Sequence, residues 1–449
     1  MPRARPRDLG VGALLASAGL VGSFAALGLN SIAVSRIEGP HGAGLVALSA
    51  QVVLIAAFVA GIGMRTSVAY RVGAGLWSPR SAVNGALRAA VVLGLVGAVL
   101  GFGGYLLLRH AAMRQFTPAM AASLMAALPF ALAWWIAPAV ALAMERFEQY
   151  ALVTVSAPVG VLVLCPLGAE VGGSTGTVLG FAGGYAVGGL ITAAWGLRLA
   201  RTPEASHGPD HGVRAAGAFG LRAWVNDLFQ FINVRPDLFI LSAYRGTAIT
   251  GVYAITISIT SLIWIASQPL ASVVLPRTAG LVAARAEPRV ETSEPHVAAV
   301  RHAVLVCALA AVAVIPALAL APLVFGPGFG RVLDLGLIMA PGVAMLGTAR
   351  VMVAAFTGRG AANHALLVGL VSFPLTFLAF LLVIPSRGAL GAALVSCASY
   401  VGVSLLSAFL FFRTTGAGAR DSLLPRGGDL RGYVVLAQRI RARTSRATR

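Results

Sequence analysis

Long apolar runs alternate with short polar breaks along almost the whole chain of 449 residues. A helix needs about 20 mostly apolar residues to cross a bilayer, and most of the runs reach that length. The pattern predicts twelve spanning helices, at residues 9–35, 43–72, 81–108, 117–143, 148–168, 174–199, 218–244, 249–280, 299–325, 332–356, 363–385 and 388–412. We therefore predict an all-α polytopic membrane protein.

The composition supports this prediction. Hydrophobic residues make up 58% of the chain, charged residues only 11%, and the mean hydropathy is +0.85. A soluble domain of this size could not bury so much apolar surface. Cys165, Cys307 and Cys397 each lie within an apolar run. We interpret them as small core residues and expect neither disulfides nor metal ligands.

All 34 basic residues are arginines, because the sequence contains no lysine. A Walker A loop, a pyridoxal enzyme and a protein kinase each require a lysine at their centre. The composition therefore excludes these three classes of protein, and we predict no cofactor.

The placement of the arginines predicts the orientation of the chain. With the N-terminus in the cytoplasm, 27 arginines fall on the inner side and six on the outer side, as the positive-inside rule requires. We expect both termini to be cytoplasmic, in a bacterial cell membrane. The apolar run after MPRARPR is too long for a signal peptide, so we expect a retained first helix. The arginine-rich tail is expected to contact anionic lipid head groups, and no nucleic acid partner is predicted.

The two halves of the sequence resemble each other. Gly39 matches Gly246 at an offset of 207, Arg146 matches Arg359 at 213, and Tyr185 matches Tyr400 at 215. A repeat of six helices gives both halves the same orientation, so they form two parallel-repeat lobes around a central cavity. The predicted parts are an N-terminal lobe (1–200), a cytoplasmic linker (201–217), a C-terminal lobe (218–413) and a basic cytoplasmic tail (414–449).

Polar residues inside predicted spans are costly in lipid and usually mark a substrate path. In the seventh span, four polar residues lie within roughly 60° of one another on an ideal helix. The first span carries a fainter version of this stripe, and the second span adds two polar residues fourteen positions apart. The candidate cavity residues are Asn30, Gln51, Arg65, Asn226, Gln230, Asn233, Arg235 and Asp237.

Two of these arginines have alternative interpretations. Arg235 points away from the stripe in an ideal helix, unless Pro236 kinks the helix there, and it could instead pair with Asp237 to hold the lobe together. Arg65 lies near the predicted inner surface and could extend its guanidinium to the lipid head groups. The HGPDH motif (207–211) contains Gly-Pro and is expected to form a loop, so we predict no metal site.

Three stretches resemble a known family. Residues 233–280 (NVRPDLFILSAYRGTAITGVYAITISITSLIWIASQPLASVVLPRTAG) resemble the seventh and eighth helices of bacterial polysaccharide flippases, the Wzx-like branch of the superfamily that also holds multidrug extruders and the lipid II flippase. GIGMRTSVAYRVGAG (61–75) resembles the end of their second helix. LVFGPGFGRVLDLGLIMAPGVAMLGTARVMVAAFTGRGAAN (323–363) resembles their ninth to eleventh helices.

The resemblance implies a flippase that moves a polyprenyl-linked oligosaccharide across the membrane by alternating access. Arg235 and Asp237 then correspond to an Arg-x-Asp-like segment of the seventh helix, and arginine would pair with the pyrophosphate. An alternative is a cation-coupled multidrug exporter in which Asp237 binds the coupling ion. A membrane-embedded glycosyltransferase or a non-transporting scaffold is less favoured, because the outer loops are short, and we predict that the protein is not an enzyme.

Overall fold

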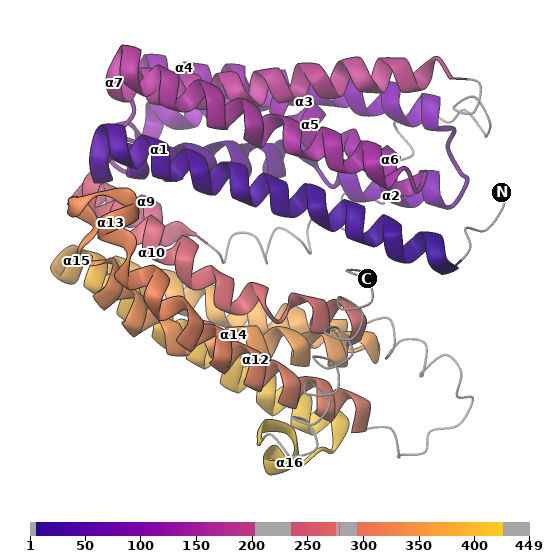
Figure 1. Ribbon diagram of the computed structural model, residues 1–449, viewed down its shortest axis with the longest axis vertical. Helices are drawn as coiled ribbons and strands as arrows, with labels where there is room; N and C mark the ends of the chain where they lie inside the picture. Colours follow the sequence, from indigo (N-terminus) through magenta and orange to yellow (C-terminus); the bar gives the residue numbers. More distant parts are fainter. Residues whose placement is uncertain (1–5, 203–234, 275–277, 279–293, 425–449) are drawn as a thin grey trace, which may run out of the picture. The chain divides into compact units, whose positions relative to one another are not determined.

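The computed structural model describes residues 6–202, 235–274, 278 and 294–424. Within these ranges every regular element is a helix (Figure 1). The elements are α1 (Pro6–Gly61), α2 (Met64–Gly73), α3 (Pro79–Leu108), α4 (Pro118–Ala126), α5 (Leu128–Ile136), α6 (Pro138–Ala143), α7 (Phe147–Ala200), α9 (Pro236–Arg245), α10 (Thr247–Ile265), α12 (Glu294–Ala319), α13 (Ala321–Phe325), the 3-10 helix η2 (Pro327–Phe329), α14 (Val332–Gly358), α15 (Ala362–Thr415) and α16 (Ala419–Leu423).

Eight helices in the described part of the chain are long and apolar enough to cross a membrane. Their outward surfaces are also apolar. On α3, for example, Val99 is 73% exposed and Leu100 is 70% exposed. Adjacent exposed side chains of this kind suit lipid and would be unfavourable in water. The prediction of an all-α, multi-spanning membrane protein is therefore confirmed.

Three of these helices are each long enough to cover two predicted spans. α1, α7 and α15 contain one non-helical residue each, namely Gly39 (φ 66°), Gly173 (φ 52°) and Gly388 (φ 56°). Such backbone angles are strongly disfavoured for residues that carry a Cβ. A single glycine thus reverses the chain, and each long helix is a hairpin of two antiparallel arms.

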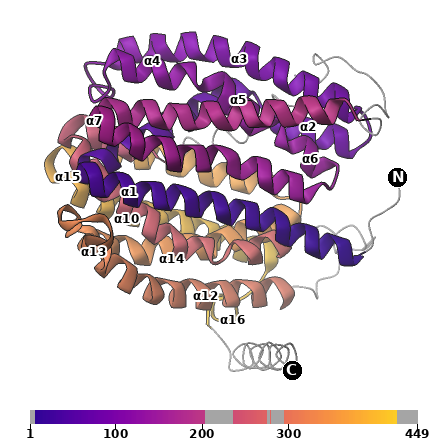
Figure 2. The ribbon, with the colours of Figure 1, turned by 45° about the horizontal axis from the view of Figure 1, so that its top comes forward.

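The two arms of α7 lie side by side in both ribbon views (Figures 1 and 2), and they pack through glycine. A Cβ placed on Gly176 would lie 1.9 Å from the carbonyl oxygen of Gly168. One on Gly160 would lie 2.7 Å from the carbonyl oxygen of Gly184, and one on Gly180 would lie 2.1 Å from that of Leu164. Glycines four residues apart therefore let the two backbones touch, as small residues do in membrane helix pairs.

The glycine turns follow the predicted internal repeat. Gly246, with φ 83°, separates α9 from α10 and matches Gly39 at the offset of 207. Gly388 matches Gly173 at the offset of 215. Equivalent turns at equivalent positions support the pairing of the two halves of the sequence.

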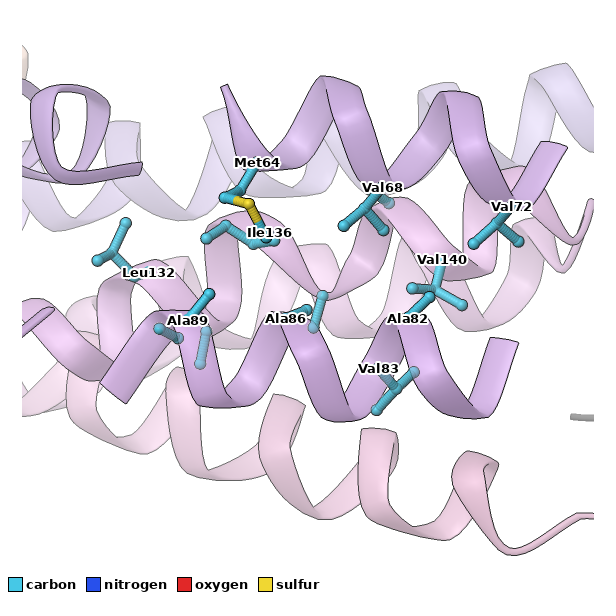
Figure 3. Close-up of a cluster of buried hydrophobic side chains, with 14 of the residues drawn as sticks. Met64, Val68, Val72, Ala82, Val83, Ala86, Ala89, Leu132, Ile136 and Val140 are labelled. Carbon is cyan, nitrogen blue, oxygen red and sulfur yellow. The ribbon is translucent and has the colours of Figure 1, made fainter. Parts of the chain in front are cut away.

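The chain divides into two compact units. Unit 1 contains Met1–Ala254 and Pro322–Phe329, and unit 2 contains Ile255–Ala321 and Gly330–Arg449. Each unit has its own apolar core. In unit 1, small and branched side chains of α2, α3, α5 and α6 interdigitate (Figure 3). The lobe boundaries expected from the sequence stay a prediction.

Residues 322–329 belong to unit 1 because the first hairpin holds them. The Arg36 guanidinium donates a hydrogen bond from Nε to the carbonyl oxygen of Val324 (2.7 Å) and a second from Nη2 to that of Leu323. Gly328 packs against the ring of Pro40, where a Cβ would approach to 2.7 Å. Since the C-terminal carbonyls of a short helix lack intrahelical partners, Arg36 caps α13.

Candidate functional site

Asp237 is the buried acid among the predicted site residues that the structure describes. Its side chain is 3% exposed and lies in the first turn of α9. One carboxylate oxygen accepts a hydrogen bond from the Leu238 N–H (3.0 Å), and the other accepts one from the Tyr253 hydroxyl (2.7 Å). A helix N-terminus also favours a negative charge, so these contacts offset part of the cost of burying the carboxylate.

Arg235 directly precedes α9. Its backbone (φ −149°, ψ 34°) is not helical, and Pro236 occupies the first helical position, which proline suits. α9 therefore begins at Pro236, and the kink predicted there stays a prediction because residues 203–234 lie outside the described residues. Arg235 is half-buried and attracts the Asp237 carboxylate electrostatically. This attraction does not decide between the two interpretations of Arg235, so its role stays a prediction.

Asn30 lies on the first arm of α1 and is completely buried. It lies beside Cys165 of α7, and neither polar atom of its amide has a hydrogen-bond partner of normal geometry among the described residues. A buried unpaired amide costs about 1–3 kcal/mol. Asn30 therefore retains free hydrogen-bonding capacity inside unit 1 and stays a candidate.

Gln51 and Arg65 do not lie on one continuous helix. α1 ends at Gly61, Ile62 (φ 41°) and Gly63 (φ 64°) take left-handed conformations, and α2 begins at Met64. The spacing of fourteen residues therefore does not place the two side chains on one face of a helix, because the helix is interrupted between them. Gln51 is half-buried on the second arm of α1.

Arg65 is held by aromatic side chains. Its guanidinium carbon lies 4.4 Å from the centre of the Trp135 ring on α5, and Nη2 donates to the Tyr150 hydroxyl at 3.4 Å. No described carboxylate forms a salt bridge with it. A cation held on a ring face keeps the N–H groups at its edge available.

Arg350 resembles Arg65 and was not among the predicted site residues. It lies on α14, six residues inside the end of the predicted span at 332–356, and it is one of the 27 arginines that the predicted orientation places on the inner side. Its guanidinium carbon lies 3.9 Å from the centre of the Trp264 ring on α10. The signal in the sequence was an arginine inside a span with no acidic residue three or four positions away on either side.

Three predicted site residues, Asn226, Gln230 and Asn233, lie outside the described residues. In the described ranges, no group of three or more His, Cys, Asp or Glu side chains could hold a metal ion. Cys165 and Cys307 are buried, as their interpretation as core residues requires, and Cys397 is partly exposed.

Solved transporter structures share this fold. The lipid II flippase MurJ, in an inward closed conformation, matches with a TM-score of 0.68 and 11% identity over 91% of this chain and 89% of its own. A multidrug resistance MATE family transporter in an inward-facing conformation matches with a TM-score of 0.62 and 17% identity over 90% and 94%. The MATE multidrug transporter DinF-BH matches with a TM-score of 0.54 and 15% identity over 95% and 98%.

No protein-family model matches the sequence, and no curated protein matches it either. The structural matches extend over nearly the whole chain at identities far below those that carry a function. The multi-spanning fold of this chain is therefore similar to that of the matched MATE family transporter, which is a member of the MOP superfamily.

Proposed function

We propose that this protein is a flippase that moves a polyprenyl-linked, negatively charged oligosaccharide precursor across the bacterial cytoplasmic membrane by alternating access. A fold shared with the lipid II flippase MurJ supports this proposal, although the MATE transporters share it equally. The choice between an anionic lipid-linked oligosaccharide and a cationic drug as the substrate rests on the sign of the uncompensated charge in the spans.

In the described spans the uncompensated charge is positive. The Asp237 carboxylate already accepts two hydrogen bonds and has Arg235 near it. Arg65 and Arg350, in contrast, have tryptophan rings and no described carboxylate as neighbours. Two cations in a low-dielectric medium favour an anionic substrate and repel a cationic drug. This is the observation that carries the proposal.

The test is transport by the full-length protein reconstituted in lipid vesicles. We expect movement of a fluorescent polyprenyl-pyrophosphate oligosaccharide between the leaflets. Asp237→Asn and Arg235→Ala should abolish this movement without lowering the amount of protein in the membrane. Arg65→Gln should slow it strongly, and Arg88→Gln, at an exposed position of α3, is the matched control.

A second assay separates the flippase from the exporter. The same vesicles are loaded with a lipophilic cationic dye, whose charge is opposite to that of the glycolipid. Efflux of the dye driven by a sodium or proton gradient, without movement of the glycolipid, would replace this proposal with that of a cation-coupled multidrug exporter.

A further inference from the structure

The environment of Arg350 in unit 2 is unusual for a charged group in a spanning helix. α14 is about 40 Å long, and Arg350 is attached about 12 Å from its C-terminal end, calculated from the rise per residue. The side chain is half-buried. Among the described residues, its guanidinium donates no hydrogen bond and forms no salt bridge. A charge at this depth usually has a partner, and the described residues supply a ring but no hydrogen-bond acceptor.

A close helix crossing fixes the position of Arg350. One turn earlier on α14, a Cβ on Gly347 would lie 2.5 Å from the sulfur of Cys307 and 3.2 Å from the Cα of Trp264. The Ser267 hydroxyl donates a hydrogen bond to the Gly347 carbonyl oxygen at 2.9 Å. α10 and α14 therefore touch at Gly347, and this contact brings the Trp264 ring under the guanidinium of Arg350.

The direction of the side chain argues against an extension to the head groups at the end of the helix. Side chains on an α-helix lean toward its N-terminus. The Arg350 guanidinium therefore leans away from the nearer, C-terminal end of α14 and toward the middle of the span. The Tyr400 phenol of α15 lies close enough to interact with it electrostatically. The cation thus lies on the ring of Trp264, which comes from a neighbouring helix.

An arginine and a tryptophan also meet in unit 1, with the helices exchanged. There the arginine (Arg65) is on α2 and the tryptophan (Trp135) is on α5, and the Tyr150 hydroxyl completes the group. In unit 2 the tryptophan is on α10 and the arginine on α14. The two groups are not aligned in sequence, since position 135 corresponds to Thr348 at the offset of 213. The two arginine–tryptophan pairs therefore occupy different positions in the two halves of the sequence.

This arrangement has a defined ligand chemistry. A ring under one face of a guanidinium leaves the N–H groups at its edge free, and these groups match two oxygens of one phosphate. A carboxylic acid or a sulfate offers fewer oxygens or a lower charge than a pyrophosphate ester.

We propose that Arg350 and Trp264 form a phosphate-binding subsite in unit 2, which takes the phosphoryl oxygens of a phosphorylated lipid. This inference rests on the proposed function, because it identifies the part of the lipid-linked substrate that unit 2 binds. Arg350 binds the oxygens, and Trp264 positions the guanidinium.

The test uses the full-length protein in nanodiscs of phosphatidylcholine, with calorimetric titration of farnesyl pyrophosphate and of farnesol. The two probes share a polyprenyl tail and differ only in the phosphates. Arg350→Gln should weaken the binding of farnesyl pyrophosphate by about tenfold to a hundredfold, as expected for the loss of charge-assisted hydrogen bonds, and leave the binding of farnesol unchanged. Arg413→Gln is the matched control, because Arg413 lies over the ring of Phe409 but is exposed at the end of α15.

Two further variants separate binding from positioning. Arg350→Lys keeps the charge but loses the planar pair of donors, so it should recover only part of the affinity. Trp264→Leu should weaken binding, and its effect should not add to that of Arg350→Gln because both act through one guanidinium. If Arg350→Gln binds farnesyl pyrophosphate as the wild type does, and both variants fold, the subsite does not exist.

Another series of nanodiscs distinguishes the two sources of phosphate. These contain equal amounts of phosphatidylcholine and phosphatidylglycerol. Weaker binding of farnesyl pyrophosphate in these nanodiscs for the wild type, but not for Arg350→Gln, would assign the subsite to a membrane phospholipid. Equal binding in both lipids would assign it to the transported substrate. A wild-type protein that binds the probe but moves no glycolipid in vesicles would overturn the proposed function and leave the subsite standing.

Discussion

The contact between the two arms of α7 makes Gly176→Ala a severe substitution. The added Cβ would lie 1.9 Å from the Gly168 carbonyl oxygen, whereas an ordinary contact needs about 3.3 Å, so the arms must separate by about 1.4 Å. Overpacking of a tight interface costs about 1–3 kcal/mol. Because the glycines at 180, 184 and 188 continue the same contact, the separation also disrupts the packing at these positions. We expect a loss near 3 kcal/mol in the free energy of unfolding.

The assay is unfolding of the purified protein in mixed micelles by increasing fractions of sodium dodecyl sulfate, followed by tryptophan fluorescence. Gly172→Ala is the control, because the same methyl group there meets no atom within 4 Å. It should be neutral or slightly stabilising, by up to about 1 kcal/mol. A Gly168→Ala, Gly176→Ala double variant should lose less than the sum of the single losses, since the first methyl already separates the arms. Equal stability of Gly176→Ala and Gly172→Ala would refute the proposed backbone contact.

Three more substitutions test other features. Tyr253→Phe removes the hydroxyl donor to Asp237 and should cost about 1.5–3 kcal/mol in the same unfolding assay; a smaller loss than for Leu241→Val would contradict the importance of this bond. Arg36→Gln frees the carbonyls of α13, so amide hydrogen exchange should accelerate in residues 322–329 and nowhere else in unit 1. Gly388→Ala forces an L-residue to φ 56° and should cost about 1–2 kcal/mol, while an unchanged midpoint would argue against a one-residue turn.

The apolar runs predicted the spanning helices well, because the length of a spanning helix is fixed by the bilayer and not by the rest of the fold. The turns between paired helices were harder to predict. The stretch around Gly39 contains Glu38, Pro40 and His41 and has the composition of an ordinary loop. Its helices nevertheless continue to the glycine on both sides. Only the packing of the two arms reveals that one residue is sufficient for the reversal.

The candidate site depended on contacts between distant residues. Asp237 was identified from its own helix, but its partner Tyr253 lies on the next helix and meets it through the turn at Gly246. Arg350 was missed because Trp264 is 86 positions away in the sequence, and no periodicity links the two. The predicted span at 43–72 did not include the break at Ile62 and Gly63, which lies between Gln51 and Arg65, because an apolar run does not reveal where a helix is interrupted.

The one-residue turns also have a consequence for biogenesis. Two arms joined by a single glycine have no loop to hold them apart, so during synthesis the second arm meets the first as soon as both have left the ribosome. α1, α7 and α15 should therefore enter the membrane as preassembled pairs. The same turns leave no room for a fused peptide: an epitope inserted at Gly173 should block insertion, whereas one placed between α3 and α4, at residues 110–115, should be tolerated.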